Sequence, residues 1–164
     1  VALGEGDTRP SARIAALQKA INEAGSSSPA TDDIERDVWT KFVFFSAVSG
    51  VTAAGRCTIG DIVATPELGE LFRRVVSETA AIGRALGVSL GPDMESRAWS
   101  AARALPKTMR ASTAIDLENG RPLEIDWISG AAARLAKKAG IPARINEALY
   151  ALLLPYKHGV RGSA

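Results

Sequence analysis

The chain has 164 residues, 46% of them hydrophobic and 23% charged, which suits one globular domain with its own core and excludes general disorder. Its 20 basic and 18 acidic residues leave a net charge of +2, too small for a surface that binds nucleic acid or an anionic membrane, so we expect neither partner. The single cysteine, Cys57, excludes an internal disulfide and favours a reducing, cytoplasmic setting.

Alanine is abundant, with 29 residues, and runs of β-branched residues are few, which favours helix over sheet. In chain order, helices are predicted over residues 11–24, 32–53, 58–63, 65–86, 92–105, 108–118, 124–139 and 143–154. Asp32 or Asp33 is expected to cap the second of them, and a strand is expected, if anywhere, over residues 1–3. Helix-like stretches are followed by glycines placed as C-terminal caps: Gly25, Gly55, Gly87, Gly120 and Gly140. The predicted fold class is all-α, a multi-helix bundle.

Residue content excludes several kinds of site. Zinc needs clustered cysteine and histidine, and the chain has only Cys57 and His158, so we expect no metal. No G-x-G-x-x-G follows a predicted strand, and no phosphate loop of the form G-x-x-x-x-G-K-[ST] is present. The longest uncharged run, residues 42–55, is shorter than the roughly 20 apolar residues of a membrane-spanning helix. We expect it to form a buried core helix.

That helix carries one charge, Lys41, between Val38 and Gly55. A lysine on so apolar a helix loses hydration, which eases release of its proton near neutral pH and suits a general acid. Helical spacing places four further residues on the face of Lys41: Phe45, Val48, Ser49 and Thr52. In the alternative, which the pattern alone favours, Lys41 extends its aliphatic stem along the helix and keeps its ammonium group in water.

A second unusual segment covers residues 109–130. Ser112 and Thr113 are followed by Asp116 one helical turn later, and Glu124 and Asp126 stand at a predicted helix start. Helix capping alone is an adequate explanation, because acidic side chains suit the positive end of a helix.

Together the two segments resemble the C-terminal domain of the ketopantoate reductase (2-dehydropantoate 2-reductase) family. The family pattern is roughly Ser-Met-x-x-Asp, then GR, then TEID and an N-G or S-G pair, and residues 112–130 read STAIDLENGRPLEIDWISG. Upstream, WTKF resembles the W-x-K-[FL] start of the family's long central helix, and ETAAIGRALG and AGIPARINEALYALL resemble its later helices. The resemblance covers nearly the whole chain.

The resemblance implies an oxidoreductase that reduces ketopantoate, a small 2-oxoacid, to pantoate with NADPH, a step of pantothenate biosynthesis. It implies an all-α domain of the 6-phosphogluconate dehydrogenase C-terminal type, which often forms a homodimer. Lys41 matches the catalytic lysine that protonates the carbonyl oxygen. Glu124 matches the glutamate that holds this lysine or a substrate hydroxyl, and Ser112 matches the serine that binds the substrate carboxylate.

Four positions depart from the family pattern, one of them Leu123, which stands where the family commonly has threonine before the glutamate. Phe45 and Ser49 stand where the family has asparagines that line the substrate pocket, and Thr113 replaces its methionine. Phe45 cannot donate amide hydrogen bonds, so one alternative is a bulkier or more apolar 2-oxoacid as substrate. The other alternative is a helical dimerisation module without activity of its own.

The resemblance also implies a domain division. Residues 1–31 match the tail of a cofactor domain, a first helix and a linker, and residues 32–164 match the all-α substrate and catalytic domain. The N-terminal Rossmann domain is absent from this sequence, which also lacks an initiator Met. We therefore expect a piece of a longer protein that is inactive alone, with NADP bound mainly by the absent domain.

Overall fold

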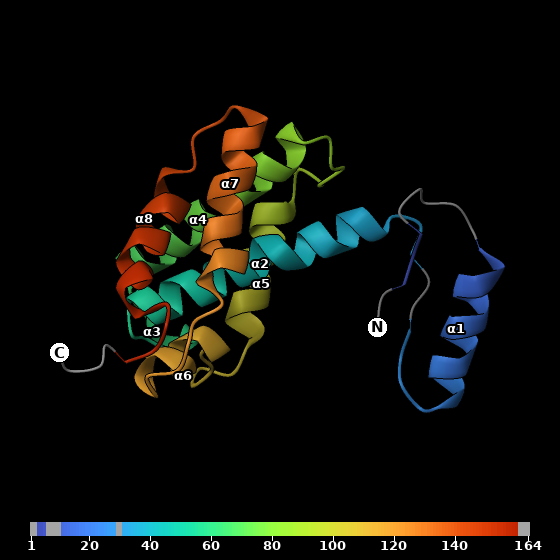
Figure 1. The fold of residues 1–164 in the computed structure, drawn as a ribbon, viewed down its shortest axis with the longest axis horizontal. Helices are drawn as coiled ribbons and strands as arrows, with labels where there is room; N and C mark the ends of the chain where they lie inside the picture. Colours follow the sequence, from blue (N-terminus) through green and yellow to red (C-terminus); the bar gives the residue numbers. More distant parts are fainter. Residues whose placement is uncertain (1–2, 6–10, 29–30, 161–164) are drawn as a thin grey trace. The chain divides into compact units, whose positions relative to one another are not determined.

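A computed structural model describes residues 3–5, 11–28 and 31–160 of the chain, and this part is all-α, which confirms the predicted fold class (Figure 1). Its elements are α1 (Ala12–Glu23), α2 (Ile34–Ala54), α3 (Ile59–Ala64), α4 (Pro66–Ala85), α5 (Met94–Ala104), α6 (Ser112–Glu118), η1 (Ile125–Trp127), α7 (Ser129–Ala139), α8 (Arg144–Leu153) and η2 (Leu154–Tyr156). Of residues 1–3, over which a strand is expected, Val1 and Ala2 lie outside the described residues, and Leu3 is described as a single β-bridge residue. None of the helices in the described part is long and apolar enough to cross a membrane.

The chain divides into two compact units, Val1–Lys41 and Phe42–Ala164, and the boundary falls inside α2. In the first unit, the side chain of Ser11 caps α1 by accepting the backbone N–H of Ile14 at 3.3 Å. Asp33 accepts the N–H of Arg36 at 2.9 Å, so the prediction that an aspartate caps the second helix is confirmed.

The second unit is built around the apolar part of α2. Val43 and all residues from 46 to 53 are buried, as expected for an uncharged run too short to span a membrane. Gly50 lets α8 approach closely, because a Cβ atom there would lie 2.8 Å from Cδ1 of Leu149. Around this core, α4 packs against α3, α5, α7 and α8 (Figure 1).

Two predicted helix boundaries are wrong. The sixth helix begins at Ser112 rather than near residue 108, because the carbonyl groups of Lys107 and Met109 accept backbone N–H groups from the start of α3 at 2.8 and 2.9 Å. The helix predicted over residues 124–139 is interrupted at Ile128, whose φ of −111° and ψ of −98° separate η1 from α7. Long-range contacts and a local break therefore override the helical pattern at these points.

The end of α2 also differs from the expected glycine cap. A Cβ atom on Gly55 would lie 2.9 Å from the carbonyl oxygen of Val51, so the close approach of the chain requires glycine there. The left-handed position falls one residue later, on Arg56, with φ of +47°. Cys57 closes the turn by donating its N–H to the carbonyl of Thr52 at 3.1 Å, as in a Schellman motif.

Candidate active site

The first turn of α6 is fixed on α2 by hydroxyl groups. Ser49 Oγ and Thr113 Oγ1, each on a residue that is 3% exposed, are hydrogen-bonded at 2.6 Å. One turn further along α2, Thr52 Oγ1 accepts the backbone N–H of Ala111 at 3.3 Å. Ser112 lies between these two anchored residues and its own side chain is exposed. The arrangement therefore holds an accessible hydroxyl at a defined place beside α2.

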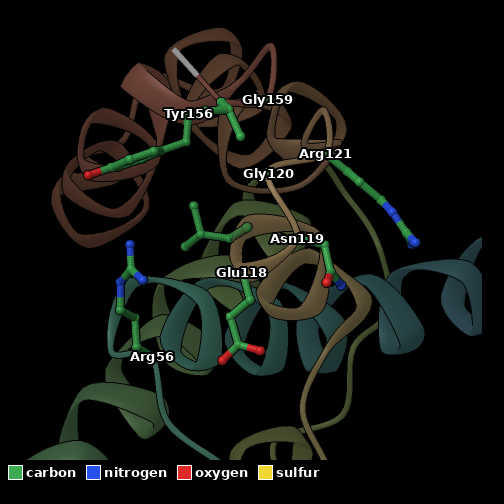
Figure 2. A pocket seen from close by; sticks show the side chains of 9 residues that line it. Arg56, Glu118, Asn119, Gly120, Arg121, Tyr156 and Gly159 are labelled. Carbon is green, nitrogen blue, oxygen red and sulfur yellow. The ribbon is translucent and has the colours of Figure 1, made fainter. Parts of the chain in front are cut away.

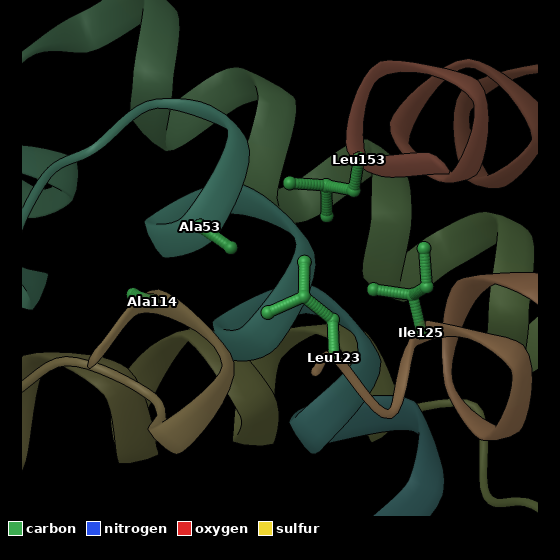
Figure 3. Packing of buried hydrophobic residues seen from close by; sticks show 5 residues of the cluster. All are labelled: Ala53, Ala114, Leu123, Ile125 and Leu153. Atoms are coloured by element: carbon green, nitrogen blue, oxygen red, sulfur yellow. The ribbon is translucent and has the colours of Figure 1, made fainter. Parts of the chain in front are cut away.

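The backbone position of Glu124 is fixed by its two neighbours in sequence and not by contacts of its own side chain. Leu123 and Ile125, which flank it, are 6% and 1% exposed. Both belong to one hydrophobic cluster with residues of α2, α6 and α8 (Figure 3): Ala53, Ala114 and Leu153. Burying a side chain of this size contributes about 1.5–3 kcal/mol. Glu124 itself is exposed, and its carboxylate makes no hydrogen bond or ion pair with another described residue, so this carboxylate is available to a ligand.

The C-terminal segment clamps the chain around Glu124 from its other side. The N–H of Leu123 donates to the carbonyl of Lys157 at 2.9 Å, and Pro122 forms an antiparallel bridge with His158. The backbone before Glu124 is thus fixed by hydrogen bonds as well as by burial of its neighbours.

Asp126 adds an ionic contact to this clamp. Its carboxylate lies 2.6 Å from Nζ of Lys157 and accepts a hydrogen bond from the Tyr150 hydroxyl at 2.8 Å. The Lys157 ammonium, and secondarily the Tyr150 hydroxyl, lower the pKa of Asp126 below its ordinary value. The same contact raises the pKa of Lys157. Asp126 is therefore committed to structure and is not a free acid or base.

Lys41 and Phe45 occupy successive turns of α2, and both are exposed. The exposure of Lys41 agrees with the alternative in which its ammonium group stays in water. The Phe45 ring is 45% exposed and meets Phe44 edge-on at a centroid distance of 5.9 Å. Lys41 belongs to the first unit, whereas Ser49, Ser112 and Glu124 belong to the second.

The role of Thr113 was missed from the sequence. Ser49 and Thr113 both depart from the family pattern, and the structure shows that they are hydrogen-bonded to each other. Ser49 is consequently buried beneath the first turn of α6 and its hydroxyl is already used. The available signal was that both departures introduce a hydroxyl-bearing residue.

Comparison with known proteins identifies the family. Residues 33–157 match the family described as ketopantoate reductase PanE/ApbA, C terminal. The chain belongs to this family. The resemblance found in the sequence is thereby confirmed, and the family is one of oxidoreductases.

Relatives and solved structures agree with this assignment. The 2-dehydropantoate 2-reductase of Archaeoglobus fulgidus is 29% identical over 158 residues, which cover 96% of this chain and 53% of the relative. The structure of 2-dehydropantoate 2-reductase from Methylococcus capsulatus superposes with a TM-score of 0.85 at 26% identity, covering 97% of this chain and 52% of that one. The chain spans about half the length of the curated relatives it matches.

Two further structures share the fold at lower identity. Dimeric ketopantoate reductase from Staphylococcus aureus has a TM-score of 0.84 at 20% identity and covers 91% of this chain and 52% of its own. D-mandelate dehydrogenase with NADH and anilino(oxo)acetate has a TM-score of 0.79 at 21% identity, with 90% and 63% covered. These two likenesses concern the fold alone.

Proposed function

We propose that this chain is the substrate-binding and proton-donating domain of an NADPH-dependent reductase that converts 2-dehydropantoate to pantoate. The observation that carries the proposal is that the bond between Ser49 and Thr113 anchors the turn of Ser112, while the neighbours of Glu124 pack with Ala114 of the same helix in one apolar cluster. Family membership supports the reaction class, and relatives named 2-dehydropantoate 2-reductase support the substrate.

In the proposed reaction, Lys41 donates a proton to the substrate carbonyl oxygen as hydride reaches the carbonyl carbon. Without a proton donor the addition would leave an alkoxide, which is costly to form away from water. Ser112 would hydrogen-bond the substrate carboxylate, and Glu124 would hold the Lys41 ammonium or a substrate hydroxyl. Ser49, already paired with Thr113, would position Ser112 rather than touch the substrate.

NADPH would supply the hydride when bound. The described residues of this chain contain no β-sheet, so they do not form the strand–turn–helix unit that cradles a dinucleotide pyrophosphate. We therefore assign no residue here to the cofactor and propose that a Rossmann domain outside this sequence holds it. The proposed division stays that of residues 1–31, the tail of a cofactor domain with a first helix and a linker, and residues 32–164, the substrate and catalytic domain. A cytoplasmic setting also remains a prediction.

The test is NADPH oxidation with ketopantoate by the full-length protein. Lys41→Ala is expected to lower kcat by about 10²- to 10⁴-fold, the usual contribution of a general acid. Lys137→Ala, which removes another exposed lysine, should leave kcat unchanged. The 164-residue chain alone should oxidise no NADPH. A kcat for Lys41→Ala within threefold of the parent would contradict the assignment.

A bulkier 2-oxoacid is a second candidate substrate, because the Phe45 ring is exposed on the α2 face that carries Lys41. An apolar substrate group would cover this ring and gain from its burial. This candidate predicts a higher kcat/KM for an aromatic 2-oxoacid than for ketopantoate, and Phe45→Asn should reverse the order. A preference for ketopantoate in the parent protein would exclude it.

A homodimer is proposed as the assembly, since the fold is shared with a dimeric ketopantoate reductase and the end of this chain exposes Leu152 and Leu154. If the chain were instead a dimerisation module without catalytic function, light scattering would show a stable dimer while a panel of 2-oxoacids left its melting temperature unchanged.

A further inference from the structure

A pocket of about 390 Å³ lies in the second unit and shares no residue with the proposed catalytic set. Three segments line it: Arg56 in the turn after α2, the end of α6 with the turn that follows, and the C-terminal segment (Figure 2). The turn and the C-terminal segment hold each other, because the N–H of Val160 donates to the carbonyl of Gly120 at 3.0 Å. The pocket is therefore formed by fixed backbone and has the size of a small-molecule site.

Arg56 gives this pocket its uncompensated charge. Glu118 forms an ion pair with Arg110, and Arg121 lies 3.6 Å from the carboxylate of Asp116. The guanidinium group of Arg56 makes no hydrogen bond or ion pair with any other described residue. In Figure 2 its guanidinium group is directed toward the side of the pocket that carries Tyr156, whereas the Arg121 side chain points away.

The backbone conformation of Arg56 is a second observation that points to a ligand. Arg56 is the one non-glycine residue with positive φ in the described part of the chain, and it fills a position that glycine normally takes. A cation near a helix C-terminus is favourable, but any residue of the last turn could supply it without a left-handed backbone. Strained residues of this kind gather at ligand sites.

The remaining lining defines the ligand. Leu117, Tyr156 and Val160 present apolar surface, and Tyr156 and Val160 are 41% and 75% exposed. An arginine binds a carboxylate through two parallel hydrogen bonds. We propose that this pocket binds a small organic carboxylate, with the carboxylate on Arg56 and an aromatic or branched apolar body against these three side chains.

The test is calorimetric titration of the 164-residue chain with benzoate, which is expected to bind with a Kd of about 1 mM or below. Arg56→Gln should weaken binding at least tenfold, and Arg103→Gln, a matched change at an exposed arginine outside the pocket, should not. Benzamide, which lacks the charge, and inorganic phosphate, which lacks the apolar body, should each bind at least tenfold more weakly than benzoate.

Arg56→Gly separates binding from folding. Glycine relieves the positive φ, so this variant should melt at a temperature no lower than the parent and still lose benzoate affinity. Ser112→Ala should leave benzoate binding unchanged, which distinguishes this pocket from the proposed substrate site. The proposal is overturned if benzoate fails to bind at about 10 mM, if Arg56→Gln binds it like the parent, if phosphate binds more tightly, or if Ser112→Ala abolishes binding.

Discussion

Glu78 on α4 caps the start of α8, and its removal tests how the core beneath the candidate site is held. Its carboxylate accepts the backbone N–H groups of Ile145 and Asn146 at 3.0 and 2.9 Å and the Asn146 side-chain amide at 2.7 Å. Asn146 is fully buried, so its two donors are poorly placed to bond water once the carboxylate is gone, whereas Ile145 is only partly buried. Helix α8 in turn supplies Leu149 against Gly50 and Leu153 to the cluster under Glu124.

Glu78→Ala is expected to lower the free energy of unfolding by about 3 kcal/mol, because it removes a helix cap and leaves buried donors unpaired. For a chain of this length, that loss corresponds to a fall in Tm of about 6–12 °C. Glu78→Gln keeps one acceptor oxygen and loses the charge, so its expected cost is about half as large. Glu147→Gln, at an exposed glutamate in the first turn of α8, should cost less than about 0.5 kcal/mol.

Urea unfolding, monitored by circular dichroism, measures these differences in unfolding free energy. The variants can be compared when they and the parent have equal m-values. The reasoning fails if Glu78→Ala costs less than about 1 kcal/mol, within the range of an ordinary surface change. It also fails if Glu78→Gln is as destabilising as Glu78→Ala, since the remaining oxygen would then contribute nothing.

Two further predictions concern the supports of the candidate site. Thr113→Val should cost about 1–2 kcal/mol in unfolding free energy by leaving the Ser49 hydroxyl buried and unpaired, and adding Ser49→Ala should recover part of that loss in a double-mutant cycle. Asp126 has a lowered pKa in the folded state, so its contribution to stability is present above the ordinary carboxyl pKa and is lost as pH falls through the folded value. In thermal melts at decreasing acidic pH, Asp126→Asn should therefore lose less stability than the parent; an equally steep fall would show that the contact with Lys157 contributes nothing.

Local chemistry made most of the helices predictable. Asp33 caps α2 as predicted, the helix predicted from residue 58 begins after Thr58, which caps it, and Pro66 stands at the first position of α4. The late start of α6 was not predictable, since it depends on hydrogen bonds from the start of α3 to Lys107 and Met109. These partners are distant in sequence and leave no periodic signal.

In the candidate site, too, local features were predictable from the sequence and long-range contacts were not. Lys41 stands out in the sequence as the one charge on an apolar helix, whereas the roles of Ser112 and Glu124 come only from the family resemblance; all three side chains are exposed in the structure, and their catalytic roles stay predictions. The pairing of Ser49 with Thr113 joins residues 64 positions apart, so no local pattern could reveal it. The left-handed Arg56 was missed for another reason: crowding around Gly55 moves the turn one residue along the chain.

The antiparallel pairing of Pro122 and Leu123 with Lys157 and His158 links the segment after η2 to the candidate site. A nonsense mutation after Leu154 would delete no catalytic side chain, yet it would strip the partners from the backbone that presents Glu124. A purification tag attached directly after this segment would strain the same backbone pairing. A fusion at this end therefore needs a long spacer.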